Sequence, residues 1–158
     1  MRISLVFIVC LNAALLGCGD SRTEYGPAGE VRAYLAELRL VLQELRALDL
    51  RVANQLSGDS IAMSHIIPLI QNDFRPTLIK QFKRVSQLRH PPELEQLDSL
   101  VKQYLQTRLS AYDIALKGER EKRYELFAEF SSLQEEADGM RPILEAEILK
   151  VRQAASGH

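Results

Sequence analysis

The chain has 158 residues, and its 20 lysines and arginines nearly balance its 21 aspartates and glutamates, for a net charge of −1 at pH 7. This balance argues against nucleic acid as a partner, because nucleic-acid binding favours a strongly basic face. Good helix formers such as leucine, glutamate and alanine are frequent, and few runs combine β-branched residues with strict alternation. The sequence therefore predicts an all-α fold, and its length suits one domain with its own core.

The N-terminus has the plan of a secretory signal peptide. A positive charge at Arg2 precedes an apolar run from Ile3 to Leu11, and small residues follow. Even when the run is extended to Leu16, it is shorter than the roughly 20 apolar residues that a membrane-spanning helix needs. We therefore expect a cleaved signal and not a permanent membrane helix.

The segment Leu15-Leu16-Gly17-Cys18 ends this signal and resembles the lipobox of bacterial lipoproteins, in which a small residue precedes an acylated cysteine. The resemblance implies cleavage between Gly17 and Cys18, removal of residues 1–17 as a signal peptide, and a lipid anchor on Cys18. Cysteine suits this role because its thiolate is the nucleophile that takes up the lipid as a thioether. The alternative is an ordinary cleaved signal that happens to contain a cysteine.

A lipoprotein of this kind is held in a bacterial membrane and faces the periplasm, so the resemblance also implies a place in the cell envelope. In that family, an aspartate directly after the lipidated cysteine favours the inner membrane, and this chain has Gly19 there. We therefore expect the outer membrane in preference to the inner one. The membrane itself is then one partner, bound through the anchor on Cys18.

The segment after the signal changes character at residue 30. Residues 18–29 combine a lipidated cysteine with glycines, a proline and polar residues, which predicts a flexible tether. Over residues 30–56, apolar residues recur at steps of three and four, which predicts the first helix. Ser57 and Gly58 are expected to end it, since glycine suits the left-handed cap.

The second helical segment has a broad apolar stripe between Ile61 and Val85, but Pro68 and Pro76 interrupt it. A proline inside a helix removes a backbone hydrogen bond, so we expect a kink or a break there. As an alternative, residues 59–67 form a loop or a short turn and the helix begins near Pro68.

Two more helices complete the chain. The third is predicted over residues 92–117 with Gly118 as its cap, and the fourth over residues 119–153 with a kink near Pro142. Residues 154–158 are expected to fray.

Four helices joined by short links should neighbour one another in antiparallel order. We therefore predict an antiparallel up-and-down four-helix bundle over residues 30–153, with the second and fourth helices kinked by proline. This bundle is the single folded domain of the chain.

The two halves of the chain resemble each other. Asp49 and its apolar neighbours match Asp113 and its neighbours 64 residues later, and Arg75–Pro76 matches Arg141–Pro142. The match predicts two related helical hairpins packed as the bundle. The alternative is coincidence, because all amphipathic helices share the same periodicity.

The matching aspartates form a candidate polar pair, since both flank the apolar stripe of their helix. A different explanation is a salt bridge at the boundary of the core for each of them. Asp49 would then pair with Arg46 and Asp113 with Lys117, each one helical turn away.

The two arginine–proline pairs, Arg75–Pro76 and Arg141–Pro142, mark a candidate groove. Each proline leaves the backbone carbonyl four residues earlier without its helical donor. Two kinked helices can open a bundle and form a groove for a peptide or an apolar ligand. The alternative is that the prolines only fit the helices to the core.

The sequence contains no recognisable catalytic motif: it has no Gly-x-Ser-x-Gly elbow, no Ser-x-x-Lys motif and no Cys-x-x-Cys-His haem site. The histidines, His65, His90 and His158, lie far apart, and none follows a glutamate at the spacing of di-iron bundles. We therefore expect no catalytic residue, no metal and no cofactor.

The leading functional expectation combines these points. It is a lipid-anchored envelope protein with a non-enzymatic binding or scaffolding role toward a protein partner at the membrane surface. Two alternatives stay open: a helical bundle that binds a small ligand or senses stress, and an unrecognised envelope enzyme.

Overall fold

The computed structural model describes residues 21–56 and 63–156, so the predicted cleavage site at Gly17, the lipidation site at Cys18 and the stop at Gly58 lie outside the described residues. Two short strands precede the helices. The elements are β1 (Arg22–Thr23), β2 (Gly26–Pro27), α1 (Ala28–Leu56), α2 (Met63–Leu69), the π-helical turn η1 (Ile70–Phe74), α3 (Arg75–Ser86), the 3-10 turn η2 (Pro92–Leu94), α4 (Glu95–Glu121) and α5 (Leu126–Ser156).

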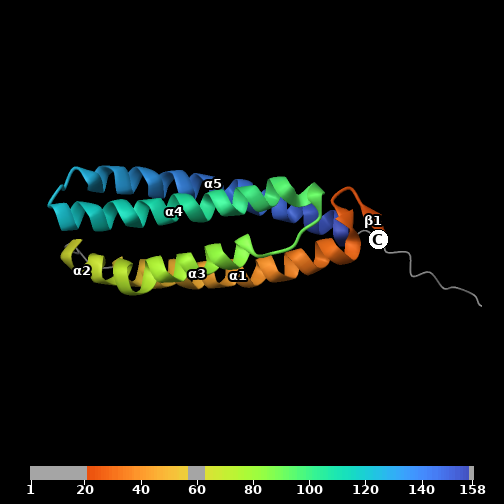
Figure 1. Cartoon of the computed structure of the whole chain (residues 1–158), viewed down its shortest axis with the longest axis horizontal. Helices are drawn as coiled ribbons and strands as arrows, with labels where there is room; N and C mark the ends of the chain where they lie inside the picture. Colours follow the sequence, from red (N-terminus) through yellow and green to blue (C-terminus); the bar gives the residue numbers. More distant parts are fainter. Residues whose placement is uncertain (1–20, 57–62, 157–158) are drawn as a thin grey trace, which may run out of the picture.

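The helices form an up-and-down four-helix bundle, which confirms the predicted all-α fold (Figure 1). Helix α1 lies beside the continuous segment α2–η1–α3, and α4 lies beside α5. Contacts between α3 and α4 and between α1 and α5 close the bundle. Helices α1 and α4 therefore run in the same direction on opposite corners, as do α3 and α5.

The core follows from the spacing of apolar residues along each helix. In α1, the predicted stripe is buried at Val41, Leu45 and Leu48 and half-buried at its last member, Val52. It continues toward the start of the helix through Val31 and Leu38. These steps of three and four keep the residues on one face of a helix with 3.6 residues per turn. Leu105 and Tyr112 of α4 are buried in the same core cluster.

In its described part, from Met63 to Ser86, the second helical segment contains both prolines in consecutive helical elements. Helix α2 begins at Met63, so the alternative start near Pro68 is wrong. Before Pro76, the chain widens into η1, where the N–H of Arg75 donates to the carbonyl of Ile70. A wider turn suits this place because proline cannot donate to the carbonyl four residues earlier. The proline kinks stay a prediction, and α5 runs through Pro142 from Leu126 to Ser156.

The predicted tether is wrong for its described part, residues 21–29. These residues form a β-hairpin in which Thr23 pairs with Gly26, followed by the start of α1. The hydroxyl of Thr23 donates to the carbonyl of Gly26 (3.0 Å) and accepts the N–H of Tyr25 (3.1 Å). The N–H of Ala28 donates to the carbonyl of Ser21 at 2.9 Å and closes the hairpin onto the helix. The glycine and the polar residues therefore serve a turn and not a free linker.

The junction between α4 and α5 also differs from the prediction. Gly118 is not a cap but a buried residue inside α4, and the helix ends at Glu121 with Lys122 in the left-handed conformation (φ 55°). A Cβ atom on Gly118 would lie 3.2 Å from the Arg123 carbonyl and 3.3 Å from the Leu126 Cβ, so the glycine permits the close turn into α5.

The far end of α5 is ordered further than expected. The helix continues to Ser156, so the predicted fraying of residues 154–158 is wrong for residues 154–156. Ala155 is buried in the core cluster, which explains why the last turn holds.

We expect the substitution Gly26→Ala to lower the free energy of unfolding by about 1–3 kcal/mol. Gly26 has φ +105°, and an added Cβ would lie 2.7 Å from the Cβ of Pro91. Thermal and urea unfolding monitored by circular dichroism would measure the change.

Gly139→Ala is the matched control. Gly139 lies inside α5, and an added Cβ meets no atom within 4 Å. Alanine there should stabilise the helix by about 0.5–1 kcal/mol. Equal effects of the two substitutions would contradict the assigned backbone conformation of the hairpin.

Candidate functional site

The structure brings the four predicted polar residues together in two ion pairs. Arg141 Nη2 lies 3.0 Å from Asp49 Oδ2, and Arg75 Nε lies 2.5 Å from Asp113 Oδ1. Each arginine therefore contacts the aspartate of the other helical hairpin. Such reciprocal pairs are the contacts that two related hairpins would form about a two-fold axis along the bundle. They support the predicted internal repeat.

The two pairs differ in burial. The side chain of Asp49 is 24% exposed and that of Asp113 is 54% exposed. Asp49 also binds Arg108, whose Nη2 lies 2.8 Å from its Oδ1 and whose guanidinium is almost fully buried. The neighbouring hydroxyl of Tyr104 accepts a hydrogen bond from Arg108 (3.1 Å). A buried cation thus rests on one partly buried carboxylate.

The alternative explanation, a salt bridge from each aspartate to a residue of its own helix, is wrong. Asp49 and Asp113 form ion pairs with arginines of other helices. Arg46 lies against Glu145 at 3.7 Å, and Asp49 is bound by Arg108 and Arg141. Sequence reasoning missed Arg108 because it is a charged residue on the buried face of α4, between Leu105 and Leu109.

The two arginine–proline pairs of the candidate groove lie beside hollows of very different volume. Beside Asp49 and Arg141 there is a cavity of only about 60 Å³, whereas ligand sites usually span about 300–1,000 Å³. Beside Arg75, an open hollow of about 800 Å³ lies between α2–η1 and α4. Arg75 and Asp113 line this hollow and neutralise each other, so the hollow attracts no particular charge through them.

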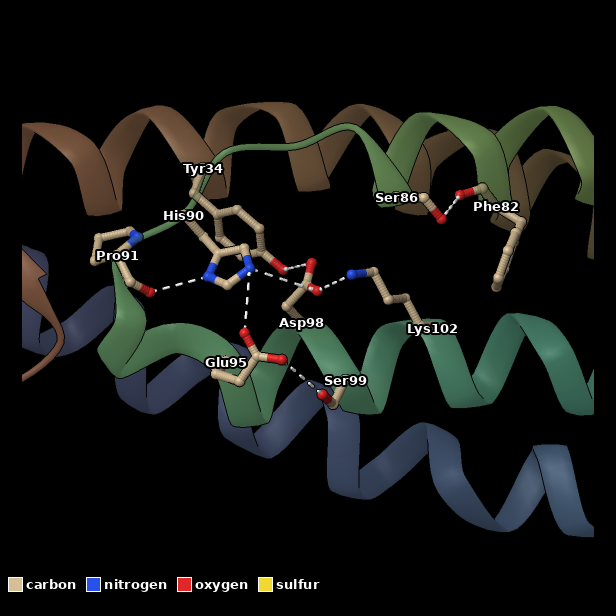
Figure 2. A network of polar contacts seen from close by, with 9 residues as sticks. All are labelled: Tyr34, Phe82, Ser86, His90, Pro91, Glu95, Asp98, Ser99 and Lys102. Carbon is tan, nitrogen blue, oxygen red and sulfur yellow. Dashed lines mark hydrogen bonds and ion pairs between the residues drawn. The ribbon is translucent and has the colours of Figure 1, made fainter.

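A second polar network is centred on Asp98, a fully buried carboxylate of α4 (Figure 2). The hydroxyl of Tyr34 on α1 donates to Asp98 Oδ1 at 3.3 Å, and Lys102 Nζ lies 2.5 Å from Asp98 Oδ2. His90 Nε2 lies 3.6 Å from Asp98 Oδ2 and equally far from Glu95 Oε2. The network therefore ties α1, α4 and the link between α3 and α4 together.

The protonation of this network follows from its surroundings. Burial, and next to it the charge of Asp98, raise the pKa of Tyr34 well above its ordinary value, so the phenol stays protonated and donates. His90 Nδ1 donates to the Pro91 carbonyl at 2.9 Å, and its ring meets Tyr34 edge-on with centroids 5.8 Å apart. The imidazole is thus fixed on both sides, which suits a clamp on the α3–α4 link.

Sequence reasoning singled out neither Tyr34 nor Asp98, although a signal existed. The two residues are 64 positions apart, which is the offset between the predicted repeats. In two parallel helices related by a two-fold axis, equivalent positions face each other at the same height across the core. The repeat therefore could have predicted this contact.

A groove of about 550 Å³ runs between α1 and α5. Along α1, Arg32, Leu35, Arg39, Leu42 and Arg46 line it at alternating steps of three and four. Ile148, Arg152 and Ala155 of α5 line its other side. We call this feature the arginine groove, because every charged residue lining it is an arginine.

The charges of the arginine groove are mostly uncompensated. Arg46 lies 3.7 Å from Glu145. Among residues 21–56 and 63–156, no carboxylate forms an ion pair with Arg32, Arg39 or Arg152. The groove therefore carries positive charge on a protein whose net charge is −1.

Helix α4 provides an internal comparison for the groove. The positions 64 residues after the alternating arginines and leucines, Arg32, Leu35, Arg39, Leu42 and Arg46, hold uncharged polar residues: Gln96, Ser99, Gln103, Gln106 and Ser110. Both helices take equivalent corners of the same bundle. The fold therefore does not require arginine and leucine at these positions, and their presence on α1 needs another explanation.

Comparison of the chain with protein-family models, with curated proteins and with solved structures gives no match. Within the described ranges, no helix has the length and apolar character to cross a bilayer. The same residues contain no cluster of three or more histidine, cysteine or acidic side chains that could hold a metal ion.

Proposed function

We propose that this protein is a lipid-anchored component of the bacterial cell envelope that docks a protein partner, without catalysis, through the arginine groove. The observation that carries the proposal is the groove itself, an exposed channel with an apolar floor. Three of its arginines, Arg32, Arg39 and Arg152, form no ion pair within residues 21–56 and 63–156. Exposed apolar surface rimmed by charge is typical of interaction sites.

The geometry of the N-terminus supports a position close to the membrane. Ser21 is held to the bundle through its bond to Ala28. If Cys18 carries the lipid, the three residue steps to Ser21 span at most about 11 Å. Arg32, near the start of α1, and Ser156, the last residue of α5, both line the groove. The start of α1 and the end of α5 lie at the end of the bundle where β1 lies (Figure 1). That end of the groove would then lie next to the bilayer surface, with the outer membrane favoured by Gly19.

The small-ligand alternative has weaker support near Pro142. The cavity beside Arg141 has about 60 Å³, which is room for little more than two water molecules. We therefore place the main binding surface on α1 and α5.

Photocrosslinking in cells would test the proposal. A photoreactive residue replaces Gln43, which lines the groove, or Gln106, which is exposed on α4. We expect one protein to be captured reproducibly from position 43 and not from position 106. An unanchored Cys18→Ser form should lose the capture.

Two results would contradict the proposal. One is equal capture from both positions, which would mean nonspecific contact. The other is an absence of crosslinked partner at doses that trap known envelope complexes.

A further inference from the structure

We infer that the segment of the partner that enters the arginine groove is an acidic amphipathic helix. This inference rests on the proposed function and deepens it, because it names the chemistry that the groove recognises. It follows from the charge of the rim, the spacing of the lining residues and the contrast with α4.

The charge of the rim selects an anionic occupant. Arg32, Arg39 and Arg152 line the groove and have no ion pair within the described parts of the chain. Each guanidinium offers a planar fork of donors that fits a carboxylate with two hydrogen bonds. A partner with glutamate or aspartate facing these arginines would neutralise them.

The spacing of the lining residues selects a helical occupant. Arginine and leucine alternate at steps of three and four from residue 32 to residue 46, which is the repeat of a helix–helix seam. Fourteen residues of helix span roughly 21 Å, about four turns of a partner helix. Leu35 and Leu42 form an apolar floor that a leucine-bearing face can cover, as in other helix-in-groove complexes.

An anionic membrane fits the same charges less well. The apolar leucines lie within a channel between two helices, and the half-buried side chains of Leu35 and Leu42 would stay uncovered under a flat bilayer. A second copy of this chain is also a weaker candidate. Its α1 has glutamates at the same seven-residue spacing, Glu30, Glu37 and Glu44, but Glu37 already pairs with Arg84 at 2.8 Å.

The test uses two synthetic probe peptides of four helical turns and the mature, lipidated chain in detergent. Both peptides have leucine on one face; one has glutamate beside the leucines and the other has lysine. Fluorescence anisotropy measures their binding to the wild type and to Arg32→Glu/Arg39→Glu. The matched control is Gln96→Glu/Gln103→Glu, which places two glutamates at the equivalent positions of α4.

We expect the wild type and the α4 control to bind the glutamate peptide at least about tenfold more tightly than the lysine peptide, because like charges in contact oppose binding. The Arg32→Glu/Arg39→Glu variant should reverse this preference. All four side chains are exposed, so both variants should keep the circular dichroism spectrum of the wild type. Binding should weaken as salt is raised.

The outcomes separate this inference from the proposed function. If position 43 still captures its partner in Arg32→Glu/Arg39→Glu cells and the glutamate peptide does not bind, the docking function stands and the acidic helix is wrong. Arginine-dependent binding of the Cys18→Ser chain to phosphatidylglycerol vesicles, without binding of the glutamate peptide, would make the groove a membrane contact. Peptide-independent dimers lost in Arg32→Glu/Arg39→Glu would make it a self-association surface. Both of these results would also overturn the inference.

Discussion

Substitution of Asp49 by alanine should lower the free energy of unfolding by about 3–5 kcal/mol, because it leaves a buried cation without its counter-charge. The side chain of Arg108 is 6% exposed, and Asp49 is its carboxylate partner at 2.8 Å. Tyr104 can keep its hydrogen bond to Arg108, but a hydroxyl cannot neutralise the charge. Urea unfolding of the two proteins, followed by circular dichroism, would measure the difference.

Asp113→Ala is the matched control, because Asp113 occupies the equivalent place in the second hairpin. Its side chain is 54% exposed and that of its partner Arg75 is 37% exposed, and exposed pairs contribute about 0–1 kcal/mol. A loss of stability as large as that of Asp49→Ala would show that burial of Arg108 is not the cause. The double variant Asp49→Ala/Arg108→Met should recover much of the stability, since it removes the buried charge together with its partner.

Substitution of Asp98 by alanine should lower the free energy of unfolding by about 2–4 kcal/mol. The change leaves the buried hydroxyl of Tyr34 without its acceptor and leaves space at a fully buried position. The cost stays below that of a wholly buried pair, because the side chain of Lys102 is 37% exposed and its ammonium can turn to water. Hydrogen exchange should also become faster in the α3–α4 link around His90, which the network clamps.

Glu95→Ala separates the effect of Asp98 from a general loss of negative charge near His90. Both carboxylates lie 3.6 Å from His90 Nε2, but the side chain of Glu95 is 68% exposed. We expect a change below about 1 kcal/mol. Similar losses for the two variants would show that the network depends on the histidine and not on burial of Asp98.

The helices were predictable where one local rule decided the structure. The stripe Val41, Leu45 and Leu48 is buried because apolar residues at steps of three and four must share one face of a helix. Local rules failed where a distant segment decides. Glycine is a typical helix cap, but at Gly118 the close approach of Leu126 decides the role of the residue. The hairpin at Gly26 packs against Pro91, which lies far along the chain.

The candidate site was predictable in its residues but not in its contacts. Asp49, Asp113 and the two arginines stood out because they match between the halves, but only the packed bundle shows that each pair crosses between hairpins. The arginine groove was missed for a different reason. Its alternation of arginine and leucine is visible in the sequence, but a search for apolar stripes finds the face toward the core and overlooks a mixed face toward a partner.

The crossed ion pairs are also the arrangement that a symmetric dimer of single hairpins would have, with each arginine–aspartate pair formed twice. Two copies joined in one chain are free to diverge, because a change in one half is no longer repeated in the other. In this chain the buried cation, Arg108, belongs to one pair, and the groove arginines of α1 have uncharged residues at the equivalent positions of α4. A protein that began as two equal halves would thereby have lost its two-fold symmetry. A partner would then bind it in a single orientation, because the two faces of the bundle are no longer equivalent.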